Sequence, residues 1–225
     1  LAWQPPAVFS LTRLLQQGWS LILLILALSV AVGILIRRYK GKSTSFEDDL
    51  RKAILQGEIE PYYQPIVNGD TGGLYGVEVL ARWKHPKSGF IPPDVFIPIA
   101  ERSGLIIPLT KGLMAKVVTQ LKPLLPKLPD GFHIGVNISA RHINAPSFIG
   151  DCRVFGKGFQ GKEVKLVLEV TEREPLVDNP HLVENLNMLH NAGFVIALDD
   201  FGTGYSGLSC LNALAIDYIK IDNSF

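Results

Sequence analysis

Five polar positions recur at the ends of five separate apolar runs, and this layout constrains the fold more than any other feature. The runs read as β-strands, and they end at Glu78, Asn137, Glu169, the pair Asp199–Asp200, and Lys220. In a barrel of parallel strands, the residues at the C-terminal strand ends meet in one site. Carboxylate and amide oxygens gathered in this way suit hard divalent cations such as Mg²⁺ or Mn²⁺. The pattern therefore predicts an α/β barrel with a polar, metal-binding site.

Strand-like and helix-like segments alternate along most of the chain, which favours a parallel sheet in a barrel or a doubly wound fold. Strands 62–67 and 74–83 could form a hairpin or be joined by a longer loop. No glycine-rich nucleotide fingerprint of the GxGxxG or GxxxxGK[ST] type follows a strand, so those two fold types have little support. The further strands are expected at 132–138, 164–170, 194–199 and 217–221, and the helices at 46–56, 94–102, 108–121, 146–153, 180–191 and 206–213.

The N-terminal part contains 18 residues without a charge, 19–36, in a chain of which 47% is hydrophobic. As a helix this stretch would be about 27 Å long, close to the hydrocarbon thickness of a bilayer. Basic residues crowd residues 37–42, and the positive-inside rule places that end in the cytoplasm. We therefore expect a transmembrane helix at 19–36, a basic linker at 37–45, and, at 1–18, the end of an upstream periplasmic region. A buried core helix is the alternative.

The net charge and the cysteine spacing argue against a nucleic-acid-binding protein and against a cysteine-based metal or redox site. The formal net charge of +1 argues against a broad nucleic-acid-binding face. Cys152 and Cys210 lie 58 residues apart and form neither a CxxC pair nor a zinc-binding spacing. We interpret both as reduced thiols of a cytosolic domain.

Taken singly, the polar residues allow simpler readings. Glu78 lies in an apolar run and needs a charged partner or a metal, and an ion pair with Arg82 would be sufficient. The adjacent carboxylates of Asp199 and Asp200 call for a nearby cation, although they could also cap a helix. Lys220 requires a phosphate, a carboxylate or an activated water as its partner.

Together with their flanking sequences, these residues resemble the EAL-domain family of cyclic-di-GMP phosphodiesterases over about residues 46–225. The similarity rests on several motifs. In the motif that names the family, Val79 replaces the alanine, a conservative change. The matching segments are YYQPIV, EVLARWKHP, IPPDVFIPIAE, VNISA, LEVTE, ALDDFGTGYSGLSCL and YIKID.

The resemblance implies a membrane-tethered enzyme that hydrolyses cyclic-di-GMP to linear pGpG with two Mg²⁺ or Mn²⁺ ions. It also implies a homodimer formed through the EAL domain, located at the bacterial inner membrane with that domain in the cytoplasm. A cyclic-di-GMP receptor without catalysis is the alternative, but such domains usually lose residues that are intact here. The implied roles are: first-metal ligands Glu78, Asn137, Glu169 and Asp199; second-metal residue Asp200, helped by Asp199; water-holding Lys220; substrate-binding Gln64, Leu80 and Arg82; and loop anchor Glu172.

The family's barrel continues past the final strand of this sequence. Its remaining strands carry a further metal-site glutamate and a glutamine that closes the site. We therefore expect these 225 residues to be a truncated EAL domain that is poorly folded or inactive in isolation, and the full-length protein to be active.

Overall fold

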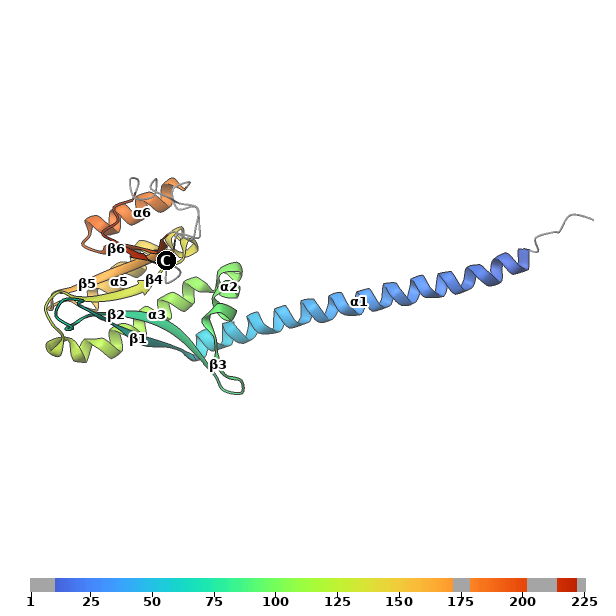
Figure 1. The fold of residues 1–225 in the computed structure, drawn as a ribbon, viewed down its shortest axis with the longest axis horizontal. Helices are drawn as coiled ribbons and strands as arrows, with labels where there is room; N and C mark the ends of the chain where they lie inside the picture. The colour runs from blue at the N-terminus through green and yellow to red at the C-terminus, as the bar shows by residue number, and fades with distance from the viewer. Residues whose placement is uncertain (1–10, 172–178, 202–213, 222–225) are drawn as a thin grey trace, which may run out of the picture. The chain divides into compact units, whose positions relative to one another are not determined.

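The computed structural model describes residues 11–171, 179–201 and 214–221. By their internal contacts the residues divide into two compact units, Leu1–Asp48 and Asp49–Phe225. The second unit contains the sheet and its helices (Figure 1).

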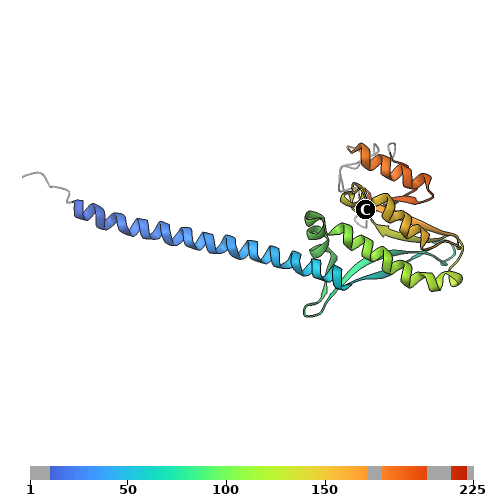
Figure 2. The ribbon, with the colours of Figure 1, turned by 180° about the vertical axis from the view of Figure 1, so that it is seen from behind.

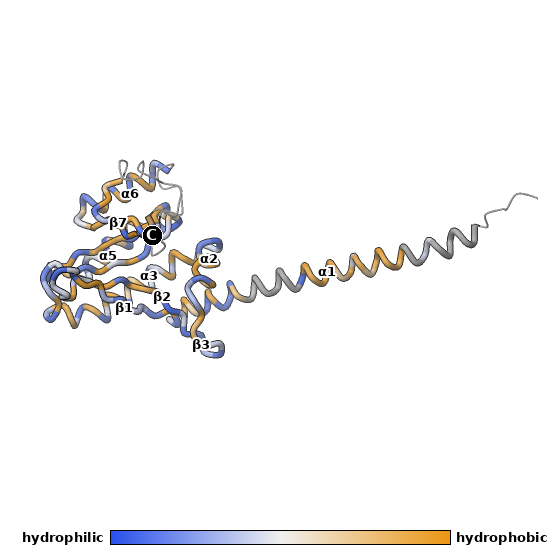
Figure 3. The backbone as a smooth tube through the Cα atoms, in the orientation of Figure 1, coloured by the Kyte–Doolittle hydropathy of each residue, from blue (hydrophilic) through white to orange (hydrophobic). Residues whose placement is uncertain are grey.

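The first helix, α1, comprises Leu11–Gln56 and is continuous through residues 37–45, where the sequence predicted a basic linker. Glycine and serine lower helix propensity without breaking a helix, and this segment has no proline. Figure 3 shows an apolar stretch within α1. No helix in the described part of the chain reaches the length and apolarity needed to cross a membrane, so the span predicted at 19–36 is not confirmed.

In the part of the chain that the structure describes, the sheet has seven strands: six follow the order β1-β2-β4-β5-β6-β7, and β3 pairs with β2. The pairs β2–β4, β4–β5, β5–β6 and β6–β7 are parallel, as the alternating pattern predicted. Within the described residues, β1 and β7 are the two edges, so the sheet is open. The strands are β1 Ile59–Val67, β2 Leu74–His85, β3 Gly89–Ile91, β4 Phe132–Asn137, β5 Val164–Thr171, β6 Val195–Phe201 and β7 Tyr218–Ile221.

Strands β1 and β2 form an antiparallel hairpin, which decides between the two connections that the sequence allowed. Asn68 organises the turn, because its Oδ1 accepts hydrogen bonds from the backbone N–H groups of Asp70 and Thr71 at 3.0 and 2.9 Å. Gly72 supplies the positive φ of 67° that the turn requires.

The helices after the hairpin form one layer. Helices α3 and α5 lie behind the sheet in Figure 1 and in front of it in Figure 2. Helix α5 also contacts α6. A doubly wound fold would carry helices on both faces, so this arrangement favours the barrel type. The helices are α2 Pro93–Ser103, α3 Ile106–Leu121, the 3₁₀ helix η1 Lys122–Lys127, α4 Ala140–Ile143, α5 Phe148–Lys157 and α6 Pro180–Asn191.

Local sequence explains the helix boundaries. Helix α6 begins where Asn179 Oδ1 accepts hydrogen bonds from the N–H groups of His181 and Leu182, with Pro180 in the first turn. Helix α2 ends at Gly104 in the left-handed conformation. The helix predicted at 206–213 lies outside the described residues.

A buried histidine joins α4 to α5 and makes folding sensitive to pH. His142 is fully buried, and its Nε2 lies 3.2 Å from Asp151 Oδ2. Asp151 also accepts hydrogen bonds from Ser147 and Lys111. Burial lowers the pKa of His142 below its ordinary value of 6.5, and Asp151 offsets this only in part. His142 is therefore neutral in the folded state at pH values where it becomes charged in the unfolded chain.

We expect the free energy of unfolding to fall as pH drops below about 6.5, because the unfolded state then binds the proton more readily at this residue. His142→Gln keeps a hydrogen-bond donor for Asp151 but cannot titrate. Between pH 6.5 and 5 its unfolding free energy should fall less steeply than that of the wild type, by up to ~1.4 kcal/mol per pH unit. Denaturant unfolding across this range measures the slope. The exposed control His181→Gln should behave as wild type, and an equal slope in His142→Gln would contradict the assignment.

Candidate metal and phosphoester site

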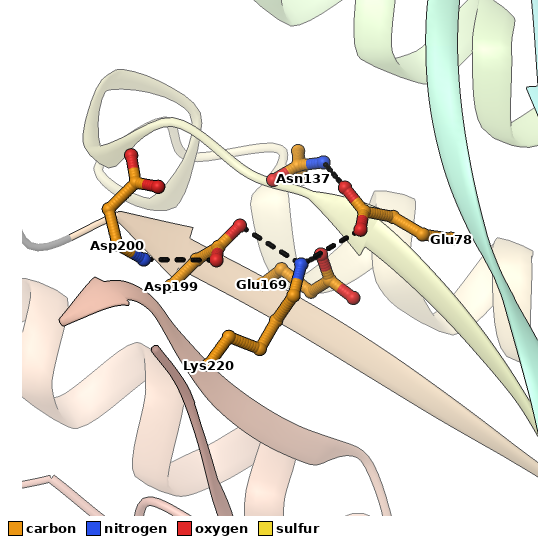
Figure 4. Close-up of polar contacts among 6 residues, drawn as sticks. All are labelled: Glu78, Asn137, Glu169, Asp199, Asp200 and Lys220. Carbon is orange, nitrogen blue, oxygen red and sulfur yellow. Dashed lines mark hydrogen bonds and ion pairs between the residues drawn. The ribbon is translucent and has the colours of Figure 1, made fainter. Parts of the chain in front are cut away.

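One ammonium joins three carboxylates from three different strands. Lys220 Nζ donates hydrogen bonds to Glu78 Oε2 at 2.9 Å, Glu169 Oε2 at 2.7 Å and Asp199 Oδ2 at 3.0 Å (Figure 4). Asn137 adds a fourth strand, because its Nδ2 donates to Glu78 Oε1 at 3.1 Å. The structure thus brings together five of the residues that the sequence singled out. Glu78 pairs with Lys220, and the Arg82 guanidinium donates to the Ala81 carbonyl oxygen instead.

Strand register explains this convergence. In the parallel pairings Asn137 lies beside Glu169, Glu78 beside Gly135, and Asp199 beside Thr171. Glu169 and Asp199 lie near the carboxyl ends of β5 and β6, and Glu78 lies where the pairing of β2 with β4 ends, so their side chains meet at one edge of the parallel sheet. The site is therefore a product of the topology and not of one local motif.

Gly135 provides the space in which the Glu169 carboxylate lies. A Cβ at position 135 would lie 2.2 Å from Glu169 Oε1 and 3.0 Å from its Cδ. Only glycine leaves room for the acid at this point of the strand. Our interpretation of the sequence missed this role, although a lone glycine inside an apolar strand often marks a close approach of two chain segments.

A local irregularity separates the two adjacent aspartates. The β6–β7 register shifts between Leu198 and Phe201, and Asp200 is the one described non-glycine residue with a positive φ, 56°. Such bulges redirect side chains beside functional sites. Asp199 faces the lysine, whereas the Asp200 carboxylate points away from the cluster and its N–H donates to Asp199 Oδ1 at 2.9 Å (Figure 4). The structure therefore does not place Asp200 in the three-acid group.

Burial and charge shape the ionisation of the cluster. Glu169 is 2% exposed, and burial raises its pKa to about 7 against the opposing effect of Lys220. Glu78 and Asp199 raise this pKa further through repulsion. Burial disfavours the charged form of Lys220, but its bonds to Glu169 and Glu78 outweigh this and raise the pKa of the ammonium. Lys220 is thus held charged at any physiological pH.

The donor set fits a divalent cation. One oxygen from each of Glu78, Glu169 and Asp199 lies within 4.8 Å of the others. When all three acids are ionised, the ammonium neutralises one of the three negative charges and leaves two. Hard oxygen donors with this residual charge match Mg²⁺ or Mn²⁺. The Asn137 side chain next to Glu78 can contribute an amide oxygen.

A cavity of about 390 Å³ adjoins the cluster, and it contains part of the predicted substrate-binding set. Leu80, Arg82, Asn137 and Asp200 line it, together with residues of α2 and α3. Gln64 does not line it and lies directly opposite Glu78 in the β1–β2 pairing, on the same face of the sheet. Glu172, predicted as a loop anchor, lies outside the described residues.

The sequence matches the family described as "EAL domain" over residues 47–225. The chain belongs to the EAL-domain family. It is 55% identical over its whole length to the probable cyclic di-GMP phosphodiesterase PdeG of Escherichia coli K12, and covers 44% of that protein. It is 45% identical over 173 residues to the cyclic di-GMP phosphodiesterase PdeL of the same organism, covering 77% of this chain and 48% of PdeL. It thus spans less than half the length of these EAL-domain relatives.

Solved structures of EAL proteins share the fold. A structure described as PaMucR phosphodiesterase in complex with c-di-GMP is 33% identical, with a TM-score of 0.69, and the match covers 79% of this chain and 72% of that one. The EAL enzyme Bd1971 in its form bound to cAMP and cyclic-di-GMP is 30% identical, with a TM-score of 0.74 and coverage of 90% and 57%. These similarities support the TIM-like EAL fold predicted from the sequence.

Proposed function

We propose that the protein containing this chain hydrolyses cyclic-di-GMP to linear pGpG. The observation that carries the proposal is the convergence of Glu78, from within β2, with Glu169, Asp199 and Lys220 near the carboxyl ends of β5, β6 and β7. In the reaction a water oxygen forms a bond to phosphorus, the bond from phosphorus to the 3′ oxygen breaks, and that oxygen takes up a proton. The relatives named as cyclic di-GMP phosphodiesterases support the choice of substrate.

The residues divide the work by their chemistry. Glu78, Asn137, Glu169 and Asp199 would hold the first ion, and Asp200, with Asp199, the second. When bound, two divalent ions lower the pKa of water and screen phosphate oxygens. Lys220 favours hydroxide over water, because a nearby ammonium stabilises the anion. Arg82 contacts phosphate, for which its planar guanidinium is suited, and Leu80 and Gln64 support the dinucleotide.

Glu78→Gln tests the proposal with little change in volume. It should lower kcat for cyclic-di-GMP by at least ~10²-fold, because it removes one of the three converging charges. The measurement is pGpG formation by the full-length protein in Mg²⁺ and in Mn²⁺. Glu184→Gln on the exposed side of α6 is the matched control and should retain activity.

Two outcomes would contradict the proposal. If Glu78→Gln formed pGpG as fast as the wild type, Glu78 would have no role in the reaction. Tight binding of cyclic-di-GMP by the wild type without pGpG in either metal would favour the receptor function instead.

We also propose attachment to the bacterial inner membrane, with the EAL domain on the cytoplasmic side. This rests on the sequence: residues 19–36 carry no charge and basic residues follow them. In the described structure many of the apolar side chains here are exposed, among them Leu28 at 66%. The full-length protein should sediment with membranes, and Leu28→Arg should weaken this association. Recovery of the wild type in the soluble fraction would refute the attachment.

We propose dimerisation through the EAL domain on the strength of the family resemblance alone. Sedimentation velocity of the full-length protein tests it. A monomer at micromolar concentration would refute it.

A further inference from the structure

An exposed aromatic pair joins β1 and β3, the two strands that flank the second half of β2. Tyr62 and Phe90 meet edge to face, with ring centroids 6.0 Å apart and an interplanar angle of 89°. They are 48% and 57% exposed. Large apolar side chains that are exposed together mark interaction sites more often than single ones.

Strand register places this pair next to residues already assigned to the substrate. Tyr62 is directly opposite Leu80, and Phe90 is directly opposite Lys84. Because side chains alternate along a strand, Leu80, Arg82 and Lys84 share the face of β2 that carries Glu78. Directly paired residues share a face, so Tyr62 and Phe90 lie there as well.

This part of β2 is not covered by its parallel neighbour. Strand β4 pairs only with Gly76–Val79, and beyond that pairing the described strands that flank β2 are β1 and β3. The exposed aromatic pair is therefore continuous with the face that leads to the metal-ligand cluster.

The chemistry of the surroundings selects the occupant. Lys84 is exposed and lies directly opposite Phe90, and Arg82 lines the cavity next to the cluster. Aromatic rings beside cationic side chains are typical of nucleotide-binding sites, because a base stacks on the ring and the cation neutralises a phosphate. An edge-to-face contact covers at most one face of one ring, so a ring face remains available for stacking.

We propose that Tyr62 and Phe90 form a stacking platform for one purine base of the dinucleotide. This rests on the proposed function and adds a binding determinant to it. The platform holds the base, and the phosphoester lies toward Arg82 and the cluster. The alternative is a purely structural role, in which the pair acts as a clip that only holds β1 and β3 together across β2. Aromatic pairs contribute ~0.5–1.5 kcal/mol to stability.

The test compares Tyr62→Ala and Phe90→Ala with the ring-preserving Tyr62→Phe in the full-length protein with Mn²⁺. Each alanine variant should raise KM for cyclic-di-GMP roughly 10-fold with kcat unchanged, as expected for loss of one stacked base. Tyr62→Phe should match the wild type. Val154→Ala, on the exposed side of α5, is the control for loss of a surface apolar group.

Inhibition by fragments separates the platform from a clip. GMP carries a base and ribose 5-phosphate does not, so the alanine variants should bind GMP roughly 10-fold more weakly and ribose 5-phosphate unchanged. Equal weakening of both fragments, or an unchanged KM with a lowered Tm, would overturn the platform. If the wild type binds cyclic-di-GMP without hydrolysing it, the proposed function fails but the platform can still be tested. The dissociation constant for cyclic-di-GMP should then be roughly 10-fold higher in the alanine variants than in the wild type, and an unchanged dissociation constant would overturn the platform.

Discussion

Replacing Lys220 with methionine should abolish turnover. Added Mn²⁺ should stabilise this variant more than it stabilises the wild type. The ammonium hydrogen-bonds to all three carboxylates, so its loss leaves their mutual repulsion uncompensated. About a third of the Lys220 side chain is exposed, so we expect a loss of about 2 kcal/mol in unfolding free energy without metal. We expect kcat to fall by at least ~10²-fold, because the water loses its charged partner.

Thermal unfolding with EDTA and with Mn²⁺, alongside pGpG formation, measures the two effects separately. Lys165→Met removes an exposed lysine of β5 and serves as the control. Mn²⁺ should restore the stability of Lys220→Met without restoring its activity, because the ion replaces the neutralising charge but not the ammonium that stabilises the attacking hydroxide. Recovery of kcat together with stability would show that Lys220 acts only as a counter-ion.

Gly135→Ala should abolish the proposed hydrolysis of cyclic-di-GMP by displacing a neighbouring acid. The added methyl would lie 2.2 Å from Glu169 Oε1, so the buried carboxylate must leave its position or the strands must separate. We expect a destabilisation of about 1–3 kcal/mol, typical of overpacking, and a loss of Mn²⁺-dependent activity. Calorimetric titration of Mn²⁺ and circular-dichroism melting measure the two consequences.

A second substitution tests whether the clash is the cause. Adding Glu169→Asp to Gly135→Ala shortens the acid and should restore part of the lost stability. Gly150→Ala is the matched control, because a Cβ there meets nothing within 4 Å and alanine favours the helix. Normal metal binding by Gly135→Ala would mean that the site tolerates a displaced Glu169.

Much of the fold could be predicted from the periodicity of apolar residues and from the residues that begin and end helices and strands. Strand β5 and helix α6 were predicted within a residue of their bounds, because apolar runs ended at clear caps such as Asn179. Helix α4, with four residues, was missed, since a single turn capped by Ser139 carries no periodic signal. The continuity of α1 through 41–45 was also missed, because poor helix formers were interpreted as a break.

The sequence predicted the parts of the candidate site that depend on residue type, but not those that depend on backbone geometry and on packing between strands. Glu78, Asn137, Glu169, Asp199 and Lys220 stood out as polar residues at strand ends, and the structure places them together. The turning away of Asp200 arises from a backbone bulge that composition does not encode. The role of Gly135 depends on a neighbouring strand, and the proposed platform depends on cross-strand register, neither of which a linear pattern shows.

The span of the lysine's bonds has a consequence for how the protein reaches its active form. Lys220 and Glu78 are 142 positions apart in the chain, and the strands between them must all be in register before the two can meet. Contacts of such long range form late, because the chain entropy of closing the intervening segment must first be overcome. A nascent chain that has not yet added β7, or a molecule that has shed it, has no assembled centre. Under the proposed function, hydrolysis of cyclic-di-GMP therefore begins only after β7 has paired with the rest of the sheet.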